Sequence, residues 1–333
     1  MSVTLALPSK GALYDGTMSL FSRCNLAVSR AGRGRGYWGA IKGLDDVHVQ
    51  FLRAEEIPLR VDSGDIHMGV TGLDLCQEHC GDSATSHVLI PSLGFGYARL
   101  VVAVPKVWID VESMNDLAEV AAAKKRLHGR AMLVGTKFHR LTRELFANHS
   151  IRDYAIVDSP GATEGMPASG AADIVVDLTS SGATLIENDL KEIAGGTAIE
   201  SEACLVVNAD TASWNDDALQ TLEHIVESLE AGLRARSRSL IHFTVKASLL
   251  KEITAALVSS YHCEVGWEPI VSDATETPAD LPVSTNVVCP TRHVYPAVRF
   301  LRQSGGASVS VMSPSLMFSD TFDTIARFRQ QLN

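Results

Sequence analysis

The segment 173–185 has the residue types of a phosphate-binding turn. It reads Asp-Ile-Val-Val-Asp-Leu-Thr-Ser-Ser-Gly-Ala-Thr-Leu, so an apolar strand ends at a carboxylate, Asp177, and small hydroxyl residues precede a helix. Backbone N–H groups in such a turn can point at one anion, and a helix dipole adds to the attraction. Gly182 permits close approach of the anion. The pattern predicts a phosphate site, with Asp177 placed for a ribose diol or Mg²⁺, although a Ser/Thr-capped structural turn fits the same residues.

The elements that must position this turn alternate between strand-like and helix-like patterns through the first two thirds of the chain. Strands are expected at 3–7, 47–52, 66–70, 88–90, 99–104, 131–134, 154–157 and 173–178. Helices are expected at 11–24, 55–62, 73–80, 114–126, from residue 141 onward, and at 219–235. Such alternation predicts an α/β fold with mainly parallel sheets.

A different pattern begins after Arg238. Strands at 240–245, 263–271, 283–289 and 307–312 enclose helices at 248–259 and 294–302, with a polar loop at 272–282. The order β-α-β-β-α-β is that of a ferredoxin-like domain, with a boundary near Ser237.

The composition restricts the class of protein. The chain has 333 residues, 46% of them hydrophobic, which is enough for two or three domains. A net charge of −10 argues against a nucleic-acid binder, and no apolar run approaches the ~20 residues of a membrane span. Six scattered cysteines suggest reduced thiols, and the short apolar N-terminus lacks a signal core. We therefore expect a cytoplasmic protein.

Other sequence signals for chemistry are weak. Cys76, His79 and Cys80 have helical spacing, but a zinc site needs about four converging ligands and no second cluster lies nearby. The chain has no Gly-x-Ser-x-Gly elbow and no Walker-type loop, so hydrolase and P-loop functions find no support.

Seven segments, in order along residues 3–207, together resemble the ATP phosphoribosyltransferase family. The segment 177–185 is similar to the family's loop for 5-phosphoribosyl-1-pyrophosphate (PRPP), Asp-[apolar]-[Ser/Thr]-Ser-[Thr/Ser]-Gly-[Ala/Ser]-Thr-Leu. The other matches are 5–11 (opening strand and turn), 53–58 (Arg-x-x-[Asp/Glu]-Ile-Pro), 67–74 (Asp-x-Gly-[Ile/Val]-x-Gly-x-Asp, with His67 at the first Asp), 134–137 (Ala-Thr-Lys-Tyr), 161–167 (Gly-x-x-Glu-x-Ala-Pro) and 201–205 (Ser-x-Ala-Cys-Leu).

One position departs from the family pattern. The family's first turn reads Lys-Gly-Arg-Leu, whereas this chain has Ala12 where the arginine stands. The resemblance implies that this arginine contacts nucleotide, so the change puts ATP binding or full activity in question. Arg33 and Arg35, in a glycine-rich turn, are possible replacements, although solvated charges on a hairpin explain them as well.

The resemblance implies a reaction and a set of site residues. Adenine N1 of ATP would attack the anomeric carbon of PRPP and release pyrophosphate, the first step of histidine biosynthesis, with Mg²⁺ held mainly by substrate phosphates. The catalytic residues would be Asp177, Lys137 and Glu164. The implied PRPP-binding residues are Asp173, Asp177, Thr179, Ser180, Ser181, Gly182, Ala183 and Thr184. The implied ATP-binding residues are Lys10, Gly11, Arg53, Thr71, Gly72 and Arg99.

The resemblance also implies a domain plan. Residues 1–104 with 200–237 would form lobe I and residues 105–199 lobe II of a periplasmic-binding-protein-like catalytic core, with residues 238–333 as a regulatory domain. That domain would bind histidine as a feedback inhibitor or only mediate assembly of a homo-oligomer, a dimer or a hexamer. Two other hypotheses stay open: a catalytically weak regulatory paralogue, and a non-enzymatic two-lobed protein that binds small ligands.

Overall fold

The computed structural model describes residues 2–30, 36–81, 83–159, 161–267, 280–321 and 323–332. Arg33, Arg35 and most of the polar loop at 272–282 lie outside these residues. The chain divides into two compact units. The first comprises Met1–Ser19, Val28–Thr221 and Thr324–Asn333, and the second comprises Leu20–Ala27 and Leu222–Asp323.

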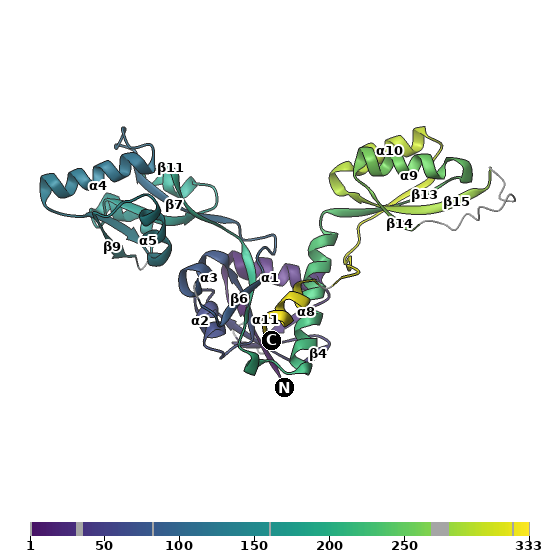
Figure 1. Ribbon diagram of the computed structural model, residues 1–333, viewed down its shortest axis with the longest axis horizontal. Helices are drawn as coiled ribbons and strands as arrows, with labels where there is room; N and C mark the ends of the chain where they lie inside the picture. Colours follow the sequence, from purple (N-terminus) through teal and green to yellow (C-terminus); the bar gives the residue numbers. More distant parts are fainter. Residues whose placement is uncertain are drawn as a thin grey trace. The chain divides into compact units, whose positions relative to one another are not determined.

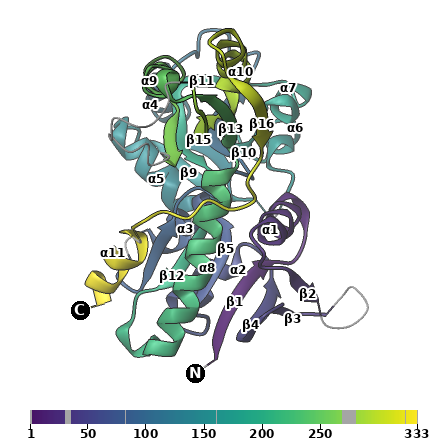
Figure 2. The same ribbon diagram turned by 90° about the vertical axis from the view of Figure 1, so that its right-hand side faces the viewer.

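The first unit contains a seven-stranded sheet, which we call the first lobe together with its helices. The strand order is β2-β3-β4-β1-β5-β12-β6. The bounds are β1 (Val3–Pro8), β2 (Val28–Arg30), β3 (Trp38–Ile41), β4 (Leu44–Leu52), β5 (Met68–Gly72), β6 (Ser86–Ile90) and β12 (Ala203–Asn208). Strand β1 runs parallel to β4 and β5, whereas β12 runs antiparallel to β5 and β6. Figure 2 shows β1 beside β4, with β3 and β2 beyond.

Helices α2 (Glu56–Asp62) and α3 (Leu73–Cys80) cover one face of this sheet. Ile57 and Val61 of α2 and Cys76 of α3 pack with Ala6 and Val206 of the strands in one buried cluster. Helix α3 begins directly after β5, so its first turn stands at the carboxyl end of that strand. Helix α1 (Gly11–Arg23) follows the carboxyl end of β1 in the same way.

A five-stranded sheet forms the second lobe of the same unit. Its order is β11-β7-β10-β8-β9, with β7 (Ala98–Pro105), β8 (Met132–Thr136), β9 (Tyr154–Asp158), β10 (Ile174–Thr179) and β11 (Leu190–Ser201). Helices α4 (Met114–His128) and α5 (His139–Asn148) pack on one face (Figure 1), and α6 (Met166–Ser169) and α7 (Ala183–Glu187) contribute to a smaller cluster on the other. Coverage of both faces explains why β7 and β10 are almost wholly apolar.

The second unit contains an antiparallel four-stranded sheet of order β14-β15-β13-β16. The strands are β13 (Arg238–Lys246), β14 (Glu264–Trp267), β15 (Pro282–Pro290) and β16 (Ala307–Met312). Helices α9 (Ala247–Tyr261) and α10 (Val294–Gln303) lie on the same face of the sheet (Figure 1), where Ile253, Leu257 and Leu301 enter its core. The predicted ferredoxin-like domain is therefore confirmed. Helix α8 (Asp216–Ala235) precedes this sheet, and α11 (Asp323–Leu332) follows it.

Two sequence expectations need correction. The sheets of the two lobes are mixed rather than mainly parallel, because β11 and β12 carry the chain back and pair antiparallel with β7, β5 and β6. Strand β7 belongs to the second sheet, so lobe I does not extend to residue 104. Helix α11 lies in the first unit, where Phe328 contacts the rings of His87 and Trp214. Residues 20–27 and 222–237, expected in lobe I, group with the second unit. We retain the domain division as a proposal with these changes.

Within the described ranges, no helix is both long enough and apolar enough to cross a membrane.

Candidate active site

Two adjoining cavities occupy the first unit, and both are lined from both lobes. The first has a volume of about 510 Å³ and the second about 580 Å³. They share three lining residues, Glu55, Leu75 and Lys137, so the two spaces meet there. Asp177 and Glu164 line the first cavity, whereas Lys10, Arg53 and Gly72 line the second. Six of the predicted site residues thus border one divided space.

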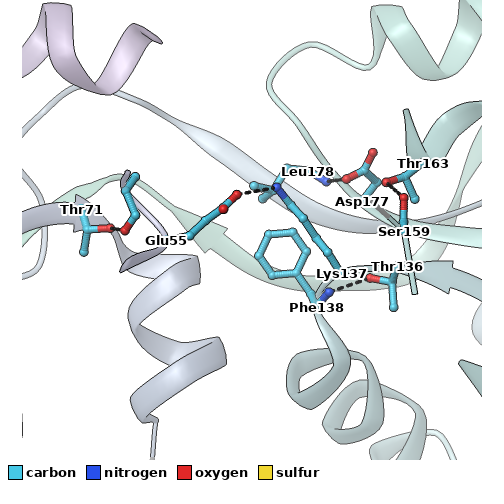
Figure 3. A network of polar contacts seen from close by, with 10 residues as sticks. Glu55, Thr71, Thr136, Lys137, Phe138, Ser159, Thr163, Asp177 and Leu178 are labelled. Carbon is cyan, nitrogen blue, oxygen red and sulfur yellow. Dashed lines mark hydrogen bonds and ion pairs between the residues drawn. The ribbon is translucent and has the colours of Figure 1, made fainter. Parts of the chain in front are cut away.

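Lys137 lies where the two cavities meet. It directly follows β8, and only Phe138 separates it from α5. The Phe138 N–H donates to the Thr136 side-chain oxygen at 3.0 Å. The Lys137 ammonium lies 3.6 Å from a carboxylate oxygen of Glu55 (Figure 3) and 5.3 Å from the centre of the Phe138 ring. Its position gives the divided space a positive charge that both cavities share.

Asp177 is the carboxylate that ends β10 at the first cavity. Its Oδ1 accepts a hydrogen bond from the Leu178 N–H at 2.9 Å (Figure 3). Burial raises the pKa of Asp177 and the Glu164 carboxylate raises it further, while the Leu178 hydrogen bond and the Lys137 charge oppose the shift. Glu164 belongs to the 3₁₀ turn Thr163–Gly165, which a 2.8 Å contact between the Ser159 and Thr163 hydroxyls holds to the end of β9.

The predicted phosphate turn follows immediately after these cavity-lining residues. Gly182 has a φ of 76° and precedes α7, so a glycine suits its left-handed backbone. The Thr179 hydroxyl oxygen accepts from the Gly182 N–H at 2.8 Å, and the Ser181 oxygen accepts from the Ala183 N–H at 3.4 Å. Two amides of the turn therefore donate hydrogen bonds to hydroxyl oxygens of the same turn. Helix α7 has only five residues, so its dipole adds less than expected.

Arg99 lies beside the phosphate turn rather than in the wall of the second cavity. It pairs with Thr179 across β7 and β10, and its guanidinium makes two bonds to Glu192, of 2.8 and 3.1 Å. These bonds raise the pKa of Arg99. The expected role in ATP binding therefore does not match its location.

Asp173 lies at the opposite end of the strand from the phosphate turn. It precedes β10, whereas the turn follows it, and the strand of six residues separates the two. Its carboxylate pairs with Lys124 and accepts the Leu133 N–H at 2.7 Å. Asp173 thus joins α4 to the sheet, a location that does not favour the expected contact with PRPP.

Asparagine at position 173 should therefore affect stability and not substrate binding. Asp173→Asn keeps an acceptor for Leu133 but loses a charged bond, so we expect a loss of about 1–2 kcal/mol, seen as a lower melting temperature. The Michaelis constant for PRPP should stay within twofold of wild type. The exposed Asp110→Asn is the control, and a large rise in that constant at position 173 alone would restore the original assignment.

The second cavity is built around the carboxyl ends of β1 and β5. Lys10, Ala12, Arg53 and Gly72 line it, so the position where the family pattern has arginine faces this space. Gly11 lies between two of these residues and has a φ of 77°. Thr71 is fully buried behind the wall, and its hydroxyl donates to the Ala54 carbonyl at 2.7 Å, which is a structural contact.

Asp74 is a buried residue of the second cavity that the sequence did not single out. Its Oδ1 accepts from the Ser201 hydroxyl at 2.6 Å, and burial raises its pKa while Ser201 and Lys137 oppose that shift. A Cβ at Gly72 would overlap this carboxylate, so Gly72 makes room for it. The final Asp of the 67–74 match was the sequence signal that could have identified Asp74.

The cysteines and histidine of the 76–80 segment lie in different surroundings. The thiols of Cys76 and Cys204 lie 3.6 Å apart in the core, whereas His79 lines the first cavity.

The charge of the first cavity bears on magnesium. Five carboxylates line it: Glu55, Glu56, Glu78, Glu164 and Asp177. Carboxylates are suitable oxygen ligands for Mg²⁺, but across the described ranges no three ligating side chains converge on one metal position. The residues therefore fit a Mg²⁺ that arrives with substrate phosphates, which would also reduce repulsion between those phosphates and the cavity.

Comparisons with known proteins find similar sequences and a similar fold. A family model described as ATP phosphoribosyltransferase matches residues 53–231. Proteins of that name from Bradyrhizobium diazoefficiens and Rhodopseudomonas palustris strain HaA2 are 41% and 40% identical. The first match covers 94% of this chain and 93% of the relative, and the second covers 98% of each.

A solved structure is similar in fold. It is titled "ATP phosphoribosyl transferase (HisG:HisZ) complex from Thermotoga maritima", and it matches with a TM-score of 0.51 and 21% identity. The match covers 68% of this chain and 96% of that chain, and it supports the two-lobed, periplasmic-binding-protein-like α/β core.

Proposed function

Because the chain belongs to the ATP phosphoribosyltransferase family of enzymes, we propose that it joins ATP to PRPP at the two adjoining cavities. Adenine N1 forms a bond to the anomeric carbon of PRPP as the bond from that carbon to pyrophosphate breaks. The products are phosphoribosyl-ATP and pyrophosphate, as in the first step of histidine biosynthesis. One observation carries the proposal: β10 ends with Asp177 at the cavity that Lys137 joins to the second, and a phosphate-type turn follows in the chain.

The PRPP would occupy the first cavity and the turn beyond it. The Asp177 carboxylate accepts hydrogen bonds from ribose hydroxyls, and the amides of Gly182 and Ala183 bind the 5′-phosphate. The Thr179 and Ser181 hydroxyl oxygens that now accept from these amides stand where phosphate oxygens would accept. The exposed Ser180, Ala183 and Thr184 leave the turn open to such a ligand.

The ATP would occupy the second cavity, where Lys10 and Arg53 supply positive charge near its phosphates. Lys137, at the junction, stabilises the negative charge that develops on the departing pyrophosphate. Alignment of both substrates across the junction lowers the barrier further, since positioning alone contributes several kcal/mol in well-ordered cases. A protein nucleophile is not required by this displacement.

Magnesium would be held mainly by substrate phosphates, with Glu164 and Asp177 as carboxylates that can complete its coordination. When bound, it neutralises phosphate charge and so favours departure of pyrophosphate. Both substrates are multiply charged and cross bilayers poorly, so we expect the enzyme in the cytoplasm.

The ferredoxin-like unit would regulate the enzyme. We infer that this unit, which has a hydrophobic core of its own, binds histidine as a feedback inhibitor and mediates assembly of a homo-oligomer, a dimer or a hexamer. A second candidate is a catalytically weak regulatory paralogue, which Ala12 in the second cavity favours.

A product assay tests the proposal directly. The full chain, given ATP, PRPP and Mg²⁺, should release phosphoribosyl-ATP and pyrophosphate in a 1:1 ratio, and histidine should lower the rate. Release of pyrophosphate without phosphoribosyl-ATP, or no turnover with both substrates bound, would contradict the enzymatic proposal. Histidine-insensitive turnover would retain the enzyme and remove only the regulator.

A further inference from the structure

A carboxylate from the first lobe caps a helix of the second lobe beside the first cavity. Glu78, on α3, accepts from the Arg140 N–H at 2.9 Å with Oε1 and from the Leu141 N–H at 3.0 Å with Oε2. The first amides of a helix have no partner within it, and negative charge is favoured there. The N-cap position of α5 is Phe138, which has no side-chain acceptor, so the cap of α5 comes from α3.

Arg140 makes a contact in the reverse direction. Its guanidinium donates to the Gln77 carbonyl near the end of α3, and another of its nitrogens lies 2.8 Å from Glu144 on α5 itself. A Cβ at Gly81 would overlap the guanidinium, so the absence of a side chain there makes room for Arg140. Glu78 and Arg140 thus join the two helices by charge-assisted bonds in both directions, and we call this pair the clasp.

The clasp is adjacent to the residue proposed to act on pyrophosphate. Lys137 lies three residues before Arg140, and Glu78 lines the same cavity as Lys137. The intervening backbone is fixed at its other end by Thr136, which accepts the Phe138 N–H at 3.0 Å. Residues 136–141 are therefore held at both ends, at one by their own strand and at the other by the opposite lobe.

The Lys137 side chain itself has little to hold it in place. Its ion pair with Glu55 is 3.6 Å long, and both partners are substantially exposed. Ion pairs of this kind fix a side chain weakly. The direction in which Lys137 enters the cavity therefore depends chiefly on where α5 begins.

We propose that Glu78 and Arg140 are positioning residues, which set the start of α5 and so place Lys137 at the junction of the cavities. This inference rests on the proposed function, since it assigns Lys137 its role in catalysis. It predicts that loss of the clasp lowers turnover only through Lys137. A purely structural contact would instead lower turnover to the same extent whether or not Lys137 is present.

A double-mutant cycle separates these alternatives. Glu78→Ala should lower kcat about tenfold in the wild-type background and less than about twofold in a Lys137→Met background, because misplacement of Lys137 no longer matters there. Glu78→Gln, which keeps the shape and one acceptor, should restore part of the loss. Glu144→Ala is the matched control: it removes a partner of Arg140 but no bond between α3 and α5, so kcat should stay within twofold.

Two results would overturn the inference: an equal fold-loss from Glu78→Ala in both backgrounds, or wild-type kcat in the single variant. If the alanine variant does not fold, the cycle is run with Glu78→Gln, whose smaller loss of kcat should again occur only in the background that keeps Lys137. Hydrogen exchange at residues 138–142 gives a readout independent of activity, and the clasp requires faster exchange there in either Glu78 variant. If the wild-type chain forms no phosphoribosyl-ATP but the Glu78 variants show this faster exchange, the proposed function is refuted and the clasp is kept.

Discussion

Replacing Lys137 by methionine is expected to lower kcat by about 10²- to 10³-fold, the usual cost of removing one group that stabilises charge in a transition state. The side chain of methionine has a similar length, so the change removes the charge and little else. Because Lys137 stands where the cavities meet, it can approach the pyrophosphate that departs between the two substrates. Steady-state kinetics with Mg²⁺, ATP and PRPP measure the effect, which should fall on kcat more than on either Michaelis constant.

Lys106→Met is the matched control for this loss. The Lys106 side chain is 42% exposed and lies 3.8 Å from a carboxylate, compared with 43% and 3.6 Å for Lys137, but it lies outside the cavities. Neither variant should change the free energy of unfolding by more than about 0.5 kcal/mol, since exposed ion pairs contribute little. A normal kcat for Lys137→Met, or equal losses in the two variants, would remove Lys137 from the mechanism.

The end of β10 illustrates what local sequence can predict. An apolar run followed by Asp177 and a Ser/Gly/Thr turn requires that a buried strand stop there, and the structure places its end at the first cavity. The same local pattern could not distinguish Asp173 from Asp177. Both carboxylates flank one strand, but only the tertiary fold determines which end faces the cavity and which end meets Lys124.

Strand β11 shows why part of the fold was missed. Its sequence, Leu-Lys-Glu-Ile-Ala-Gly-Gly-Thr-Ala-Ile-Glu-Ser, contains a glycine pair, and its pairing with β7 shifts register on either side of Thr197. Glycines and bulges interrupt the two-residue alternation by which a strand is recognised. Without this strand, the antiparallel pairing of β7 with β11 could not be expected.

Contacts between the lobes could not be predicted from the local sequence, because the residues that make them lie far apart in the chain. Glu78 and Arg140 are separated by 62 residues, and each alone reads as a charged residue on a helix surface. Asp74 and Ser201, which are hydrogen-bonded in the wall of the second cavity, are separated by 127. The chain pattern predicts which face of a helix is apolar, but not which distant polar group meets the opposite face.

Asp177→Asn should weaken use of PRPP and, at neutral pH, make the fold more stable. Loss of a charged hydrogen bond to ribose hydroxyls corresponds to about 1.5–3 kcal/mol, so kcat/KM for PRPP should fall roughly 10- to 100-fold. Burial raises the pKa of Asp177, so ionisation of this carboxylate is disfavoured in the folded state. Between its ordinary pKa of about 3.9 and the raised value, the folded chain retains a proton that the unfolded chain has lost. Stability therefore falls as pH rises through that window.

The amide cannot ionise, so the stability of Asp177→Asn should exceed that of wild type above the window, with the difference disappearing as pH falls toward the ordinary aspartate range. In the pH profile of kcat/KM for PRPP, the fall toward acidic pH that protonation of Asp177 causes should also be absent in Asp177→Asn. Asp158→Asn is the control: it ends β9 of the same sheet, but its side chain is 76% exposed, so neither change should follow. A variant at position 177 with unchanged PRPP kinetics but higher stability would mean that the buried charge serves neither ribose nor metal. The residues that bind the ribose of PRPP would then be others that line the two cavities.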